Sequence, residues 1–200
     1  MTSEILGHIG PPDERSEFLS LSFSPLGAPL RHRWRNNGVS ADFLGDYVIT
    51  FLPANGSMAT ERSQSEIRHA VTYIANEFLE NAMKYHERHV DIPIGIRLEL
   101  AGDHITLSAS NGVGFAQAQR YKGFAEYILQ ENAGDQLVTQ LEKSAAAPES
   151  GESCLGLLTM INDYRAELGW RFEFHPAYPG VMMVTTSAIL PIGTAAGESA

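Results

Sequence analysis

Three polar side chains in the middle of the chain are spaced so that they share one face of a predicted helix. Glu77, Asn81 and Lys84 stand at positions i, i+4 and i+7, which a helical period places in one row. An amide oxygen can bind Mg²⁺, a carboxylate can accept a proton or hold a water, and a lysine can neutralise phosphate charge. The row predicts a site for a metal-bound triphosphate. The spacing alone also fits a solvated helix face with an incidental lysine.

The elements that would position this row follow from the apolar residues around it. Apolar residues recur at helical spacing from Ile67 to Met83 and predict a long helix. Strict alternation from Ile92 to Leu100 and again from Ile105 to Ala109 predicts two strands, which the intervening turn joins as a hairpin. Asn111 to Gly114 is expected to end the second strand.

The rest of the chain predicts further helices and strands around this centre. Strands are expected at 17–23, 170–174 and 181–190. Helices are expected from about 41 to 52 and from 155 to about 169, with helical pieces within 115–143. The basic segment 31–35 is expected to be a solvated connection. Residues 1–16 and 193–200 are expected to be flexible tails, and 144–154 a lid, around a single domain at 17–192. This order of elements predicts an α+β two-layer sandwich, with helices on one face of a mixed, mostly antiparallel sheet.

Charge and composition exclude several classes of function. A formal net charge of -10 opposes binding to nucleic-acid phosphates. The single cysteine, Cys154, excludes an intrachain disulfide and a site with several thiolate ligands. No window approaches the roughly 20 consecutive apolar residues that a membrane helix needs, and the first residues lack the pattern of a signal peptide. A soluble cytoplasmic protein is expected.

The helix that carries the polar row also carries a longer motif. Residues 76–85, with the sequence NEFLENAMKY, resemble the N box of the GHKL superfamily, which includes gyrases, Hsp90, histidine kinases and MutL. The resemblance implies that Glu77 is a general base or orients a water, and that Asn81 is the Mg²⁺ ligand. It also implies that Lys84 and Tyr85 contact phosphate.

A second motif follows the predicted hairpin. Residues 110–114, with the sequence SNGVG, resemble the G1 box of the same superfamily, DNGxG. Ser110 and Asn111 would then lie at the nucleotide, and Gly112 and Gly114 would let the backbone approach it. Ser110 stands where the family has the aspartate that accepts the adenine amino hydrogen, and its hydroxyl can still accept a hydrogen bond without carrying charge.

A third motif matches in part. Residues 151–157, with the sequence GESCLGL, resemble the second half of the G2 box, GxGLGL, while Glu152 and Cys154 replace the glycines of the lid. Leu155, Gly156 and Leu157 would begin a helix whose backbone N–H groups could point at phosphates.

Together the three motifs resemble the single-domain GHKL regulators of bacterial partner-switching systems, which are similar to anti-sigma-factor kinases. Residues 33–38 and 155–170 also look like that group. The resemblance implies a Bergerat fold, a bound ATP or ADP with Mg²⁺, and a STAS-like protein partner, and it allows a homodimer. The chain has no pair of dimerisation helices with a phosphoacceptor histidine, so a complete histidine kinase is not expected.

Three functions remain open from the sequence. The leading hypothesis is a kinase that transfers the γ-phosphoryl group of Mg-ATP to a serine or threonine of the STAS-like partner. The second is a non-catalytic module that binds a nucleotide or another planar ligand and switches protein partners, which the changes at Ser110 and in the lid glycines favour. The third is a structural adaptor whose N-box residues bind no ligand.

Overall fold

The computed structural model describes residues 3–10, 16–25, 30–52, 62–130 and 155–192. The elements in these ranges, in chain order, are β1 (Glu4–Gly7), β2 (Glu17–Phe23), α1 (Leu30–Ile49), α2 (Gln64–Tyr85), β3 (Ile94–Ala101), β4 (His104–Gly114), α3 (Phe115–Gln130), α5 (Leu155–Tyr164), β5 (Glu167–Phe174) and β6 (Val181–Pro191). The predicted lid at 144–154 and the predicted tail at 193–200 lie outside the described residues.

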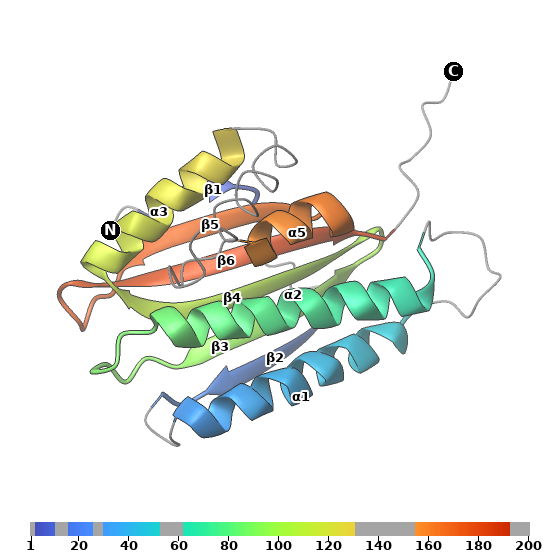
Figure 1. The fold of residues 1–200 in the computed structure, drawn as a ribbon, viewed down its shortest axis with the longest axis horizontal. Coiled ribbons are helices and arrows are strands. Elements are labelled where there is room, and N and C mark those ends of the chain that lie inside the picture. The colour runs from blue at the N-terminus through green and yellow to red at the C-terminus, as the bar shows by residue number, and fades with distance from the viewer. Residues whose placement is uncertain (1–2, 11–15, 26–29, 53–61, 131–154, 193–200) are drawn as a thin grey trace, which may run out of the picture.

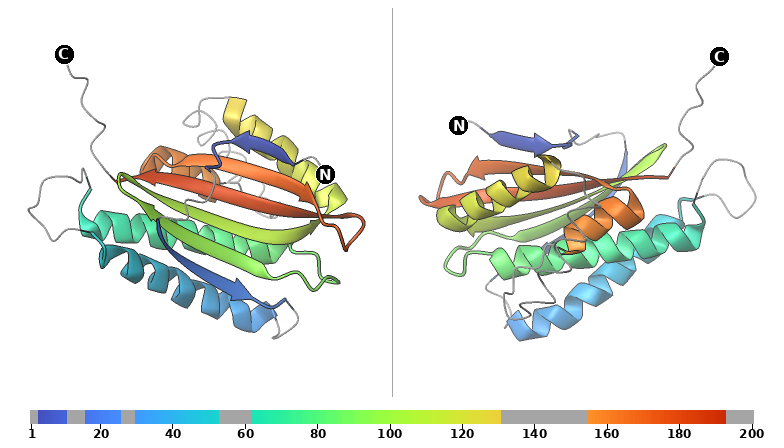
Figure 2. Two further views of the ribbon diagram at one scale, coloured as in Figure 1. Left: turned by 180° about the vertical axis from the view of Figure 1, so that it is seen from behind. Right: turned by 45° about the horizontal axis from the view of Figure 1, so that its top comes forward.

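The described strands form one sheet, and the described helices cover one of its faces. The strand order is β1-β5-β6-β4-β3-β2, and every neighbouring pair is antiparallel. Figure 1 shows the helices in front of the sheet, and the view from behind in Figure 2 shows the opposite face without a described helix. The predicted α+β two-layer sandwich is confirmed. Instead of a mixed sheet, however, the described ladders are all antiparallel.

Helix α2 lies at the centre of the helical layer (Figure 1). Its sequence fixes both the residue at which the helix starts and the face that it buries. Ser63 and Glu66 form a capping box, in which the Ser63 hydroxyl accepts from the Glu66 backbone N–H and the Glu66 carboxylate accepts from the Ser63 N–H. Nine residues between Ile67 and Met83 are buried, and they include the predicted apolar stripe. This stripe fixes the rotation of the helix, and therefore the direction in which Glu77 and Asn81 point. None of the described helices is long and apolar enough to span a membrane.

Helix α1 begins much earlier than the sequence pattern predicts. Residues 31–35 are helical and do not form a connection. The sequence pattern did not predict a helix through Gly38, because a glycine inside a helix costs about 1 kcal/mol relative to alanine. The cost is offset by buried apolar residues on the same helix: Ala41, Leu44 and Val48. Gly45 allows close packing against α2, since a Cβ there would collide with the Thr72 hydroxyl.

Strand β4 forms the predicted hairpin with β3 and then continues to Gly114. It was expected to end at 111–114, yet these residues pair with β6 as far as Val181. Leu107, Ala109 and Val113 belong to the core under the helices. Because side chains alternate along a strand, residues 108, 110, 112 and 114 lie on the opposite face of the sheet.

Helix α5 is shorter than predicted. It ends at Tyr164 and not near Gly169, and Arg165 follows with a left-handed φ of 53°. Residues 167–174 form β5, whose alternating pattern buries Leu168, Trp170 and Phe172 in the core. Because Leu168 fits a strand pattern and a helix pattern equally well, periodicity assigned it to the wrong element.

The first sixteen residues, predicted to be a flexible tail, contain a strand. Glu4–Gly7 pairs with β5 and forms one edge of the sheet. Glu4 also forms an ion pair with Lys122 of α3, at 2.5 Å between Oε1 and Nζ. The prediction failed because four residues are too few to show an alternating pattern.

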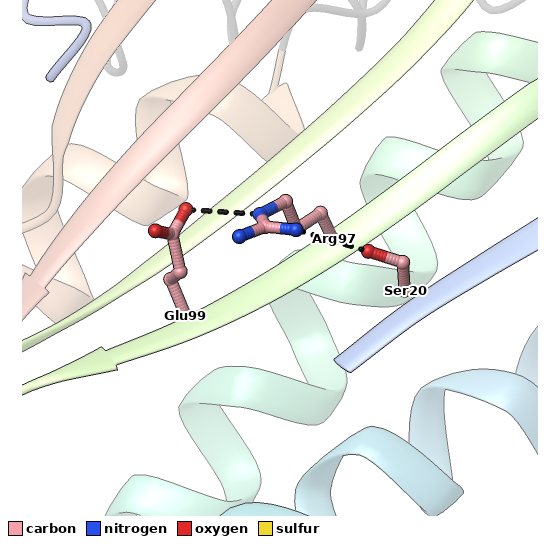
Figure 3. Close-up of polar contacts among 3 residues, drawn as sticks. All are labelled: Ser20, Arg97 and Glu99. Atoms are coloured by element: carbon pink, nitrogen blue, oxygen red, sulfur yellow. Dashed lines mark hydrogen bonds and ion pairs between the residues drawn. The ribbon is translucent and has the colours of Figure 1, made fainter. Parts of the chain in front are cut away.

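On the sheet face without described helices, Arg97 joins side chains of two neighbouring strands. Arg97 on β3 donates to Glu99 on the same strand at 3.1 Å and to the Ser20 hydroxyl on β2 at 3.5 Å, as Figure 3 shows. The Arg97 guanidinium also lies over the Phe18 ring, 3.7 Å from its centroid. Arg97 therefore ties the edge strand β2 to β3 on this face, while the predicted site lies on the other.

Candidate functional site

Glu77 lies directly against the first turn of α5. A Cβ on Gly156 would collide with Glu77 Oε2, so the carboxylate occupies the space that the glycine leaves. The first turn of a helix has backbone N–H groups without intrahelical partners, and it favours negative charge. The N-box carboxylate and the G2 glycine, far apart in sequence, are therefore neighbours in the structure.

The surroundings of Glu77 change its acidity. Burial raises the pKa of the Glu77 carboxyl above its ordinary value, and the nearby Glu80 carboxylate raises it further. Glu80 itself accepts a hydrogen bond from Asn76 Nδ2 at 2.9 Å. A carboxyl with a raised pKa accepts a proton more readily near neutral pH than an ordinary glutamate does. Glu77 therefore has the property that a general base needs.

Asn81, one turn further along α2, lines a small cavity between the helices and the sheet. The cavity has a volume of about 20 Å³ and is lined by Phe78, Asn81, Ala82, Tyr85, Ala109, Asn111, Val113, Tyr121 and Thr186. These residues come from α2, β4, α3 and β6. The volume holds about one water molecule, whereas small-molecule sites usually measure roughly 300–1,000 Å³.

Tyr121 of α3 forms part of the wall of this cavity. Its ring stacks on Tyr85, with centroids 6.1 Å apart and an interplanar angle of 25°. Its hydroxyl accepts a hydrogen bond from Trp170 Nε1 at 3.0 Å and lies 3.1 Å from the Thr186 hydroxyl. One aromatic side chain thus meets both an aromatic surface on α2 and a polar end on the sheet.

Asn111 is the G1 residue that points into the helical layer. Its side chain is buried, and its Nδ2 donates to the Ala82 carbonyl at 3.0 Å. The Ala82 carbonyl lies in the last turn of α2, four residues before the C-cap residue His86. Asn111 therefore fixes the end of α2 on β4 and forms part of the cavity wall.

Ser110 and the two G1 glycines lie on the opposite face of the sheet. Ser110 stands beside Gly95 and Thr185 in the neighbouring strands, so the structure does not bring it to the cavity. A Cβ on Gly112 would lie 2.7 Å from Ile92 Cδ1. A Cβ on Gly114 would lie 2.9 Å from Glu87 Oε2. In this structure the glycines make room for the 87–92 segment and not for a ligand.

The remaining predicted residues surround the two ends of the site. Tyr85 lines the cavity, and the Lys84 ammonium lies 5.1 Å from the centroid of the Tyr85 ring. At the start of α5, Leu157 is buried in the core while Leu155 is half-buried. The backbone of this turn, together with Glu77, forms the second end of the site.

Sequence reasoning missed Tyr121, Trp170 and Thr186 as parts of the site. Thr186 carried a signal, because it is the one hydroxyl in an apolar row on β6 that otherwise contains Met182, Val184, Ala188 and Leu190. Tyr121 and Trp170 carried no such signal, since an aromatic residue at helical or strand spacing is ordinary core. Only the three-dimensional arrangement shows that the Trp170 indole N–H and the Thr186 hydroxyl both meet the Tyr121 hydroxyl.

Comparison with known proteins relates this chain to one described complex. No protein-family model matches it, and no curated protein matches it either. Among solved structures, it is similar to a chain in the crystal structure of the SiaB–SiaC complex from Pseudomonas aeruginosa, with a TM-score of 0.54 and 19% sequence identity. The similarity covers 85% of this chain and 89% of that chain. At this identity the likeness shows the fold.

Proposed function

We propose that this chain is an ATP- or ADP-binding regulatory protein of a bacterial partner-switching system. The observation that carries the proposal is the contact between Glu77 and Gly156, one helical turn from Asn81 at the cavity. It brings together a carboxylate, an amide and the start of a helix, and helix N-termini bind phosphate groups. The proposal treats the chain from β1 to β6 as one GHKL-like domain in the cytoplasm.

In the proposed complex, the phosphates would lie near the start of α5 and near Lys84. The Asn81 amide oxygen would bind Mg²⁺, which supplies charge neutralisation to the phosphates. Within the described residues there is no cluster of three or more His, Cys, Asp or Glu side chains that could hold a metal ion by itself. Mg²⁺ would therefore depend on the phosphate oxygens of the ligand, as it commonly does in proteins.

A protein partner is the second part of the proposal. The similar solved structure is a complex of two proteins, which supports a role in protein association. The resemblance to single-domain regulators of partner-switching systems indicates a STAS-like partner, and it also allows a homodimer. The leading form of the proposal is a serine/threonine kinase in which Glu77 accepts the proton of the attacking hydroxyl.

A non-catalytic partner switch is the alternative, and two observations favour it. Ser110 faces away from the cavity, and the cavity volume of about 20 Å³ does not admit a nucleotide base. Phosphoryl transfer depends on accurate positioning. In this form, binding of a nucleotide or of another planar ligand changes partner affinity without chemistry.

Calorimetric titration with ATP and ADP, with and without Mg²⁺, tests the binding. We expect saturable binding that is weaker without Mg²⁺ and is lost in Asn81→Ala. If neither nucleotide binds, the proposed site is wrong and the structural adaptor is favoured.

A transfer assay with a STAS-like protein from the same operon then separates the kinase from the switch. Phosphorylation of that protein that disappears in Glu77→Ala supports the kinase. Nucleotide binding without any phosphorylated product supports the switch.

A further inference from the structure

We infer that the Tyr121 side chain occupies the space into which a planar ligand ring would enter. A ligand can then bind only when Tyr121, and with it helix α3, moves away from α2. This inference rests on the proposed nucleotide site and adds a mode of regulation to it.

The contacts of Tyr121 are those that a bound planar ring would need. One face of the Tyr121 ring lies against the Tyr85 ring of α2. Its hydroxyl meets the Thr186 hydroxyl and the Trp170 indole N–H at the inner end. A flat heteroaromatic ligand with a polar atom at its inner edge would make the same stack and the same hydrogen bonds.

The cavity beside Tyr121 is too small to hold a ligand ring while the Tyr121 ring is in place. With Tyr121 in place, the space between Asn81, Asn111 and Thr186 measures about 20 Å³, enough for about one water. The other walls belong to α2 and to the central strands β4 and β6, which are bonded on both sides. Tyr121 is therefore the wall that can move at the lowest cost.

Helix α3 is held to the rest of the molecule more weakly than α2. It buries three residues, and two of these, Ala118 and Ala125, are alanines, whereas α2 buries nine residues. Small buried side chains contribute little apolar area. Moving α3 therefore removes much less buried surface from the core than moving α2.

Movement of α3 would also reach the edge of the sheet. Lys122, next to Tyr121, forms the ion pair with Glu4 of β1. Near the other end of α3, Leu129 lies beside Gly7, the last residue of β1. Displacement of Tyr121 by a ligand would thus loosen β1, so that ligand binding changes a surface distant from the cavity.

Affinity measurements with three variants test the inference. ATP and ADP are titrated into the wild type, Tyr121→Ala, Tyr121→Phe and the control Tyr127→Ala, whose side chain lies on the same helix but is 40% exposed. Removing the ring removes the competing closed state, so we expect Tyr121→Ala to bind at least about tenfold more tightly. Tyr121→Phe keeps the ring but loses both hydrogen bonds and should be intermediate. Tyr127→Ala should bind as the wild type does.

Trp170 fluorescence reports the movement directly. The chain has two tryptophans, so a Trp34→Phe background leaves Trp170 as the single emitter. Nucleotide binding should break the Trp170–Tyr121 hydrogen bond and shift the emission, and the shift should be much smaller in Tyr121→Phe. Thermal unfolding of each variant establishes that it is folded, and Tyr121→Phe carries the test if Tyr121→Ala does not fold.

The outcomes separate this inference from the proposed function. Tighter binding by Tyr121→Ala or Tyr121→Phe, with the Trp170 shift in the wild type, supports the inference. Equal binding by wild type and variants, or weaker binding by the variants, overturns it and leaves the nucleotide site intact. Binding by none of the proteins overturns both.

Discussion

Because Gly156 has no side chain, the Glu77 carboxylate can lie against the first turn of α5. The Glu77 carboxylate lies where a Cβ at 156 would be, so that even an alanine must displace it. Overpacking of this kind commonly costs about 1–3 kcal/mol. The two residues therefore depend on each other, although one is in α2 and the other in α5.

We predict that Gly156→Ala lowers the free energy of unfolding by about 1–3 kcal/mol, measured by denaturant unfolding. Gly123→Ala in α3 is the matched control, because nothing lies within 4 Å of a Cβ there. Alanine should stabilise that helix by about 0.5–1 kcal/mol. Stabilisation of both variants would show that Glu77 is not held against α5.

The raised pKa of Glu77 predicts a pH-dependent stability. Because the pKa is higher in the folded protein than in the unfolded chain, where it is about 4.3, the folded state binds more protons between these two values. Unfolding free energy contributed by this group therefore falls as pH rises through that interval. Glu77→Gln should lose this term, so its stability relative to the wild type should increase from acid to neutral pH. A stability difference that stays constant over the pH series would contradict the prediction.

At the scale of elements, a buried hydrogen bond joins the end of α2 to strand β4 at the wall of the cavity. Asn111 donates to the Ala82 carbonyl at 3.0 Å, and this carbonyl belongs to the last turn of the helix. The neighbouring Ser110 lies on the opposite face of the same strand. Of these two adjacent residues, Asn111 therefore bonds to the helical layer, whereas Ser110 faces away from it.

We predict that Asn111→Ala destabilises the fold by about 1–3 kcal/mol, because it removes a buried side-chain amide together with its hydrogen bond to the Ala82 carbonyl. Ser110→Ala should change stability by no more than about 0.5 kcal/mol. Denaturant unfolding of both variants measures the difference. A larger effect at Ser110 would mean that the strand is rotated relative to the structure described above.

On the scale of the whole molecule, the two edges of the sheet differ in length and in attachment. β2 pairs with β3 over seven residues, whereas β1 pairs with β5 over four. β1 ends at Gly7, whose φ of 68° is left-handed and where an added Cβ would collide with the Leu168 carbonyl. This short edge is therefore the part of the sheet that opens most easily.

We predict that Gly7→Ala detaches β1, because a side chain in the left-handed region costs about 1–2 kcal/mol and would also collide with the Leu168 carbonyl. Amide hydrogen exchange should become faster in β1 and at the Leu129 end of α3, with little change in α2. Gly10→Ala is the control, since a Cβ there meets nothing within 4 Å. Unchanged exchange in α3 would show that β1 and α3 are not coupled.

Much of this architecture could be read from local patterns. The stripe from Ile67 to Met83 gave α2 and its rotation, and the alternation from Ile92 to Ala109 gave the central hairpin. Each of these segments is long enough for its apolar residues to distinguish the helical period of 3.6 from the strand period of two. The order of elements then favoured helices on one face of the sheet, and the predicted row on α2 did reach the interior surface at Asn81.

Other features depended on contacts between distant segments. Strand β1 is too short for a pattern, and α1 continues through Gly38 because its buried stripe outweighs one unfavourable residue. In the site, motif alignment placed Ser110 at the ligand, whereas the register of β4 with β6 points Asn111 inward. A one-residue shift along a strand reverses its face, and only pairing with a neighbour fixes that choice.

The sequence by itself determined which side chains were available for chemistry: Glu77, Asn81 and Lys84 in one helical row, and a glycine at the start of a later helix. The tertiary structure decided which of them meet. It placed Glu77 on Gly156, and it closed the cavity with Tyr121, whose hydroxyl reaches Thr186 and Trp170. Such contacts join α2, α3, α5 and the sheet, and they arise from packing that no local period in the sequence can specify.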